Sequence, residues 1–162
     1  MRRKVRIFVS YARSNRDLAA RFLDRFRDQL APSKTYNYVF SRDTDILVGE
    51  DWHDEIQKAV KRSDVGLLLV SPAFLGSQYI TKHELPKFIG DKAQPVFPVM
   101  LQPVDFERHN LKGLHRKQIF RLDSRRFRNP KAYGDCIGNQ RDRFVQSLFR
   151  KIELKMDSLF GS

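Results

Sequence analysis

The stretch VGLLLVS at residues 65–71 decides the fold class of this chain. It contains no charged residue, and its apolar side chains lack the polar alternation of a half-exposed strand. A strand of this kind is typical of the centre of a parallel sheet that is covered on both faces. The stretch therefore predicts a buried central strand in a domain that mixes strands with helices.

Apolar runs on either side of this stretch predict four more strands. They are residues 5–11 (VRIFVSY), 36–41 (YNYVFS), 95–101 (PVFPVML) and 118–123 (QIFRLD). The segment between the last two is irregular and leaves room for a short helix at most.

Apolar residues at helical spacing predict helices between and after these strands. The first helix would start at Ser14 and Asp17, which resemble a capping box. The repeating residues are Leu18, Phe22, Phe26 and Leu30, then Trp52, Ile56 and Val60, and finally Phe144, Leu148, Ile152, Met156 and Leu159. This alternation predicts a doubly wound, flavodoxin-like α/β sandwich with five parallel strands in the order 2-1-3-4-5, flanked by helices.

Sheets of this type bind ligands beyond the carboxyl ends of their strands, where the winding direction switches. Residues that follow the first three strands are therefore candidates for ligand contact. They are Ser10, Tyr11 and Arg13, then Asp43 and Asp45, and finally Ser71.

Length and composition indicate one globular domain, residues 1–162, with a formal net charge of +12. No apolar run approaches the roughly 20 residues of a membrane span, and the first residues lack the apolar core of a signal peptide. We therefore expect a cytoplasmic protein without a membrane partner. The single cysteine, Cys136, excludes an internal disulfide and agrees with a reducing compartment.

The positive charge is densest at residues 124–131 (SRRFRNPK), where four cations surround Phe127. A solvated loop is the simplest interpretation, and a polyanionic partner is the alternative. Direct contact with nucleic acid is not expected, because no zinc-finger, helix-turn-helix or RNA-binding signature accompanies the patch.

Several chemistries lack their signatures in this sequence. The glycines form neither GxGxxG nor a Walker-type loop, and no GxSxG nucleophile elbow occurs. The four histidines show no metal-ligand spacing, so we expect neither a metal nor a bound cofactor. A carboxylate that carries the reaction with polar helpers remains possible.

Glu84 is the anomalous carboxylate, in the stretch SQYITKHELPKFI at residues 77–89. At helical spacing it shares one face with Ile80 and Phe88, where an ionised group loses its hydration. It needs a structural partner, such as Lys87 or Arg13, or else its partner is a substrate. Pro86 removes a backbone donor, so we expect the helix to bend or break near residue 82.

Three stretches in order resemble the TIR (Toll/interleukin-1 receptor) domain in its bacterial form. They are IFVSYARSNRDLAARFLDRFRDQL, then FSRDTDILVGEDWHDEIQKAVKRSDVGLLLVSPAFLGSQY, then HEL. The first corresponds to the opening box of the family, and the second contains its BB loop and a strand that ends in LSP. The agreement is continuous over residues 5–101 and weak beyond them.

The resemblance implies one of two functions. Many members of the family cleave the nicotinamide glycosidic bond of NAD, with a catalytic glutamate on the helix after the third strand, which corresponds here to Glu84. The products would be nicotinamide with ADP-ribose or a cyclic isomer, and NAD would be a substrate rather than a cofactor. Other members are scaffolds without catalytic activity that recruit further TIR domains.

Further roles follow from the resemblance. Tyr11 and Arg13 fall where family members contact the nucleotide. Many active members carry a tryptophan four residues before the glutamate, where this chain has Ile80, and the adjacent Tyr79 could supply an aromatic surface instead.

The BB loop opens with Asp43 and Asp45, and the family uses it for contacts between protomers. The expected contact residues are Ile46, Leu47, Gly49 and Trp52, although Trp52 also has the spacing of a core residue. The resemblance therefore implies activation by self-association, in the setting of bacterial anti-phage immunity. The domain could be excised from a longer protein, with a sensor as a further segment or a separate subunit.

Overall fold

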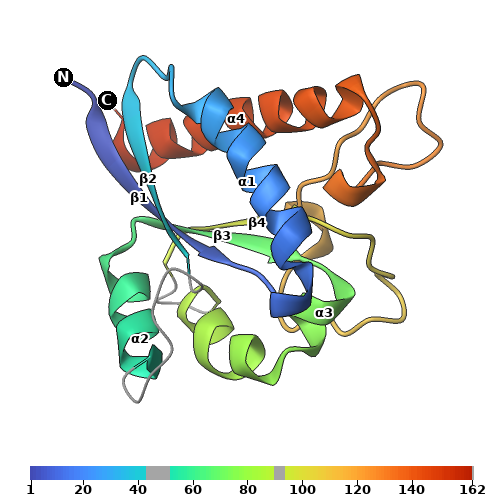
Figure 1. Ribbon diagram of the computed structural model, residues 1–162, viewed down its shortest axis with the longest axis horizontal. Helices are drawn as coiled ribbons and strands as arrows, with labels where there is room; N and C mark the ends of the chain where they lie inside the picture. The colour runs from blue at the N-terminus through green and yellow to red at the C-terminus, as the bar shows by residue number, and fades with distance from the viewer. Residues whose placement is uncertain (43–51, 90–93, 162) are drawn as a thin grey trace.

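A computed structural model describes residues 1–42, 52–89 and 94–161. Its centre is a parallel sheet of four strands, β1 (Arg3–Ser10), β2 (Tyr36–Arg42), β3 (Val65–Val70) and β4 (Val96–Met100), in the order β2-β1-β3-β4 (Figure 1). Each strand lies within about two residues of its predicted limits. Every residue of β3 is buried, as expected for a central strand.

Helices cover both faces of the sheet and make three layers (Figure 1). Helices α1 (Arg16–Leu30) and α4 (Asn139–Phe160) cover one face, which we call the α1/α4 face. Helices α2 (Trp52–Arg62) and α3 (Pro72–Gly76) cover the other, the α2/α3 face, together with the segment that carries Glu84. The flavodoxin-like arrangement predicted from the sequence is confirmed.

Alternation along β1 assigns its side chains to the two faces. Val5, Ile7 and Val9 belong to the hydrophobic cluster under α1 and α4, whereas Phe8 belongs to the cluster under α2 and α3. The two clusters are therefore separated by the sheet itself.

The predicted fifth strand does not form in the described residues. A single parallel bridge joins Val99 to Phe120, with the Met100 amide donating to the Phe120 carbonyl at 2.9 Å and the Phe120 amide donating to the Pro98 carbonyl at 2.8 Å. Pro98 has no amide hydrogen to continue the ladder in one direction. Two residues after Phe120, Leu122 pairs with Lys131 rather than with β4. The segment lies beside β4 as predicted, but two local features prevent a strand.

The predicted capping box at the start of α1 is wrong. The helix begins at Arg16, after the 3-10 turn Arg13–Asn15, and its N-cap is Asn15 without a side-chain capping bond. The Asn15 side chain bonds elsewhere, as described below.

The expected interruption near residue 82 is confirmed. Residues Ile80–Glu84 form a π-helix that is followed by the 3-10 turn Leu85–Lys87. The Leu85 amide donates to the Ile80 carbonyl five residues back. Pro86 cannot donate to residue 82, so the helix changes its winding here.

No helix among the described residues is both long and apolar enough to cross a bilayer.

Candidate functional site

The carboxyl edge of the sheet is tied together by a chain of hydrogen bonds. The Ser71 hydroxyl accepts from the Phe74 amide at 3.0 Å and so caps α3. It donates to Asn15 Oδ1 at 2.6 Å, and Asn15 Nδ2 donates to Gln102 Oε1 at 2.9 Å. Segments that follow β1, β3 and β4 are thereby joined at the end where ligands bind in this fold.

Asn15 and Gln102 were missed by the sequence analysis. They are 87 positions apart, and neither lies in a motif that signals chemistry. In the structure Asn15 is buried and central to the chain of bonds. The sequence offered one indication that these two residues meet. Both follow strands that were predicted to be parallel, and parallel strands end at the same edge of the sheet.

Ser10 ends β1 and is fully buried. It follows Phe8 by two positions, so its side chain points to the α2/α3 face. Within the described part of the chain, its hydroxyl oxygen has no hydrogen-bond partner. An unsatisfied buried hydroxyl is rare in proteins and is a candidate for ligand contact.

Glu84 lies in the same layer and is 0% exposed. Its neighbours Ile80, Leu85 and Phe88 all belong to the hydrophobic cluster of the α2/α3 face, so the apolar stripe predicted around the glutamate is confirmed. Glu84 also makes at least one bonding or electrostatic contact, so it is not a free carboxylate. Lys87 and Arg13, the two cations considered as structural partners, are exposed at the surface.

Close packing holds the Glu84 segment against the sheet. The Phe88 ring lies over Gly66 of β3, where a Cβ atom would come within 2.4 Å of Phe88 Cε1. The ring also stacks on Phe8 of β1, with centroids 6.2 Å apart. On the other side, Gln57 of α2 donates to the His83 carbonyl at 3.3 Å.

The remaining predicted residues are distributed around this layer. Tyr11 is buried in the cluster of the α1/α4 face, and Arg13 is exposed. Tyr79 is half-buried, and its ring lies 4.8 Å from that of His83.

The BB-loop predictions fall outside the described residues. They are Asp43, Asp45, Ile46, Leu47 and Gly49. Trp52 is the first residue of α2, but its side chain is outside the description as well.

Other chemistries gain no support from the described residues. Among them, no group of three histidine, cysteine or acidic side chains could hold a metal ion. Burial raises the pKa of the Cys136 thiol, which keeps it protonated and unreactive at neutral pH.

Residues 7–133 match the protein-family model described as TIR domain. No curated protein matches the chain. The match begins within β1 and covers the other three strands of the sheet and the whole Glu84 segment.

Proposed function

Because the chain belongs to the TIR domain family, we propose that it cleaves the nicotinamide glycosidic bond of NAD and that Glu84 is the catalytic carboxylate. The family includes enzymes with this activity. The observation that carries the proposal is a fully buried glutamate in an apolar layer, on the segment that follows the central strand. Perturbed environments of this kind are typical of functional carboxylates.

The chemistry suits a single carboxylate. As the bond between C1′ and the pyridinium nitrogen breaks, its electron pair neutralises the nicotinamide ring, and positive charge develops on the ribose. A carboxylate held in a poorly hydrated layer stabilises that charge. Water then adds to C1′ and releases a proton, which gives ADP-ribose. Attack by a nucleophile within the substrate itself would give a cyclic isomer instead.

Four other residues have roles in the proposal. The Ser10 hydroxyl, which lies on the same face of the sheet, supplies a hydrogen bond to a ribose oxygen. Arg13 supplies positive charge for the pyrophosphate. The partly exposed Tyr79 ring supplies an aromatic surface beside Ile80, where other members carry tryptophan. Ser71 acts indirectly, because it caps α3 and holds Asn15.

Substrate access is the step that requires a change in structure. Glu84 is 0% exposed, so a ribose reaches its carboxylate only after neighbouring groups move. We propose that self-association through the BB loop produces this change. The biological setting proposed is anti-phage defence, in which a fused or separate sensor starts the assembly.

The same burial favours the alternative function, a scaffold without catalytic activity. A glutamate that stays enclosed by Ile80, Leu85 and Phe88 would contribute to folding rather than to catalysis. The domain would then act by recruiting other TIR domains.

Nicotinamide release from NAD, followed over a range of protein concentrations, separates the two functions. The enzyme proposal predicts release that rises more than linearly with protein concentration, with ADP-ribose or its cyclic isomer identified by mass spectrometry. No release under conditions in which light scattering detects oligomers would leave only the scaffold.

A further inference from the structure

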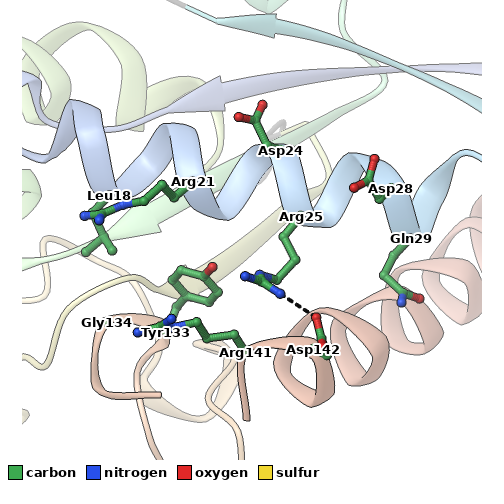
Figure 2. Close-up of a pocket in the computed structure, with 10 residues that line it drawn as sticks. All are labelled: Leu18, Arg21, Asp24, Arg25, Asp28, Gln29, Tyr133, Gly134, Arg141 and Asp142. Atoms are coloured by element: carbon green, nitrogen blue, oxygen red, sulfur yellow. Dashed lines mark hydrogen bonds and ion pairs between the residues drawn. The ribbon is translucent and has the colours of Figure 1, made fainter. Parts of the chain in front are cut away.

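A groove on the α1/α4 face has no role in the proposed reaction. It lies between α1 and the start of α4 and encloses about 560 Å³ (Figure 2). Tyr133 and Gly134, of the 3-10 turn Tyr133–Asp135, form part of its wall. The sheet separates this groove from the layer of Glu84, so its function can be tested independently of NAD cleavage.

Three arginines from two elements line the groove. Arg21 and Arg25 are one helical turn apart on α1, which places them on the same side of the helix. Arg141 comes from the first turn of α4. Figure 2 shows Arg25 and Arg141 extending from the two helices into the space beside Tyr133.

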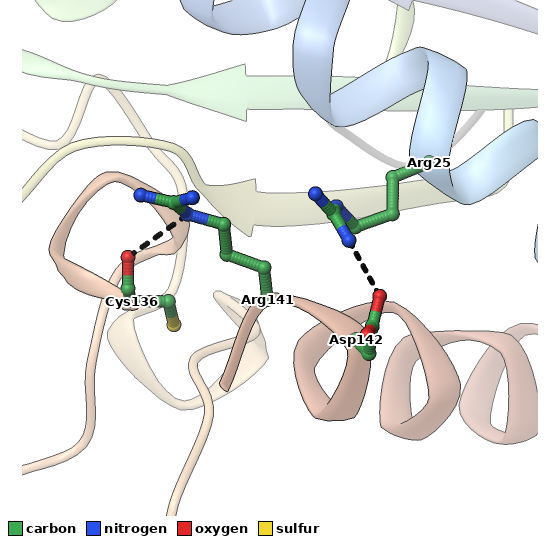
Figure 3. A network of polar contacts seen from close by, with 4 residues as sticks. All are labelled: Arg25, Cys136, Arg141 and Asp142. Atoms are coloured by element: carbon green, nitrogen blue, oxygen red, sulfur yellow. Dashed lines mark hydrogen bonds and ion pairs between the residues drawn. The ribbon is translucent and has the colours of Figure 1, made fainter. Parts of the chain in front are cut away.

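Existing contacts fix two of these guanidinium groups but use few of their donors (Figure 3). Arg25 Nη1 lies 2.5 Å from Asp142 Oδ1, and Arg141 Nε donates to the Cys136 carbonyl at 3.2 Å. Each guanidinium carries five N–H donors. Arg25 Nε is buried and makes no hydrogen bond within the described ranges. Hydrogen bonds to Asp142 and to Tyr133 raise the pKa of Arg25, which keeps this group fully charged.

The acidic residues that line the groove equal its arginines in number, but they are not all paired with them. Asp24 and Asp28 also line it, but both stand on the side of α1 away from Tyr133 in Figure 2. Asp24 is within 3.7 Å of Arg27, a residue outside the groove lining. Asp142 is thus the one carboxylate paired with these arginines in the described structure.

We propose that this groove binds the phosphate of a small phosphorylated ligand through Arg25 and Arg141, with Arg21 supplying a third positive charge. Guanidinium forks match phosphate oxygens in geometry and form charge-assisted hydrogen bonds with them. The open, polar lining suits an anion better than an apolar molecule. Arg25 and Arg141 are already oriented by Asp142 and the Cys136 carbonyl, so a ligand would order little else on binding.

The test is a titration of the isotope-labelled protein with inorganic pyrophosphate at constant ionic strength, followed through backbone amide NMR signals. We expect shifts at Arg25, Gly134 and Arg141 and none at Ser10 or His83, on the opposite face. The Arg141→Gln and Arg21→Gln variants should each bind about tenfold more weakly, because each removes one charged donor. Both residues are exposed, so both variants should fold.

Arg27→Gln is the matched control, with the same loss of charge on the same helix but outside the groove. Binding weakened as much by Arg27→Gln as by Arg141→Gln would overturn the proposal, since it would indicate nonspecific attraction to a basic protein. Shifts confined to the Glu84 layer, or no saturable shifts, would overturn it as well. A parallel titration with ADP distinguishes the source: tighter binding than pyrophosphate indicates a nucleotide, and equal binding a free phosphate compound.

Discussion

The two faces of the sheet are built on different principles. On the α1/α4 face, two regular helices of 15 and 22 residues pack over a cluster of aromatic rings. On the α2/α3 face, α2 is a regular helix of 11 residues, but α3 has five residues and is followed by a π-helix and a 3-10 turn. Regular helices bury apolar surface efficiently, whereas π-helical turns are rare and occur frequently at functional sites. The comparison indicates that the α1/α4 face supplies much of the stability, whereas the irregular turns of the other face carry the glutamate proposed for catalysis.

The largest expected effect comes from the stable face. Phe22 is fully buried and lies against Phe26, Tyr133 and Phe144, with ring centroids 5.6, 5.1 and 6.0 Å away. Phe22→Ala should lower the free energy of unfolding by about 3–5 kcal/mol, measured by urea denaturation. Asp28→Ala, an exposed change on the same helix, should have little effect. A loss below 1 kcal/mol for Phe22→Ala would contradict the assignment of stability to this face.

Gly66→Ala tests the packing beneath the Glu84 segment. The added methyl group would meet the Phe88 ring at 2.4 Å, so the ring and its segment must move. We expect a loss of about 1–3 kcal/mol in unfolding free energy, and nicotinamide release per folded molecule should fall as well. The control is Gly76→Ala, because a Cβ there has open space around it. Equal nicotinamide release by the two variants would show that catalysis does not depend on the packing of Phe88 against Gly66.

Asn15→Ala tests the chain of hydrogen bonds at the carboxyl edge. It removes the acceptor of Ser71 and the donor to Gln102, and it should cost about 1–2 kcal/mol in unfolding free energy. Asn15→Asp keeps the acceptor, and the Gln102 amide can rotate to donate to the new carboxylate. The aspartate variant should therefore be the more stable of the two. If Asn15→Ala were the more stable variant, the side-chain oxygen of Asn15 would not be the acceptor of the Ser71 hydroxyl.

The smallest effect is a dependence on alkaline pH at the edge of the stable face. Burial, with a hydrogen bond to Asp157 at 2.7 Å, raises the pKa of Tyr36 to about 12. In the unfolded chain a tyrosine deprotonates near about pH 10. Between these two values the unfolded state loses a proton that the folded state keeps, so stability falls as the pH rises.

Tyr36→Phe should remove this part of the decline. The measurement is the difference in unfolding free energy between pH 9 and pH 11, compared between the variant and the wild type. A decline of the same size in both proteins would assign it to other groups.

Local patterns were enough to predict much of the fold. Continuous apolar runs predicted the four strands, and helical spacing predicted the helices over residues such as Phe22 and Ile56. Pro86 predicted the interruption before the structure identified it as a π-helix. Each of these features depends on residues within a few positions of one another.

Two of the contacts that the sequence did not reveal join distant residues, and two of its predictions failed for local reasons. The bond between Asn15 and Gln102 spans 87 positions, and the pair of Arg25 and Asp142 spans 117. The capping box failed because the segment before α1 turns as a 3-10 helix. The fifth strand failed because Pro98 lacks an amide hydrogen and because Leu122 pairs with Lys131, which no periodicity indicates.

The burial of Glu84 agrees with its position in the predicted apolar stripe, whereas its catalytic role stays a prediction. Nicotinamide release by the wild type, by Glu84→Gln and by Glu107→Gln, an exposed control, tests that role most directly. We expect release by the wild type and the control, and none above background for Glu84→Gln with an unchanged circular dichroism spectrum. Release by Glu84→Gln at the wild-type rate would contradict it.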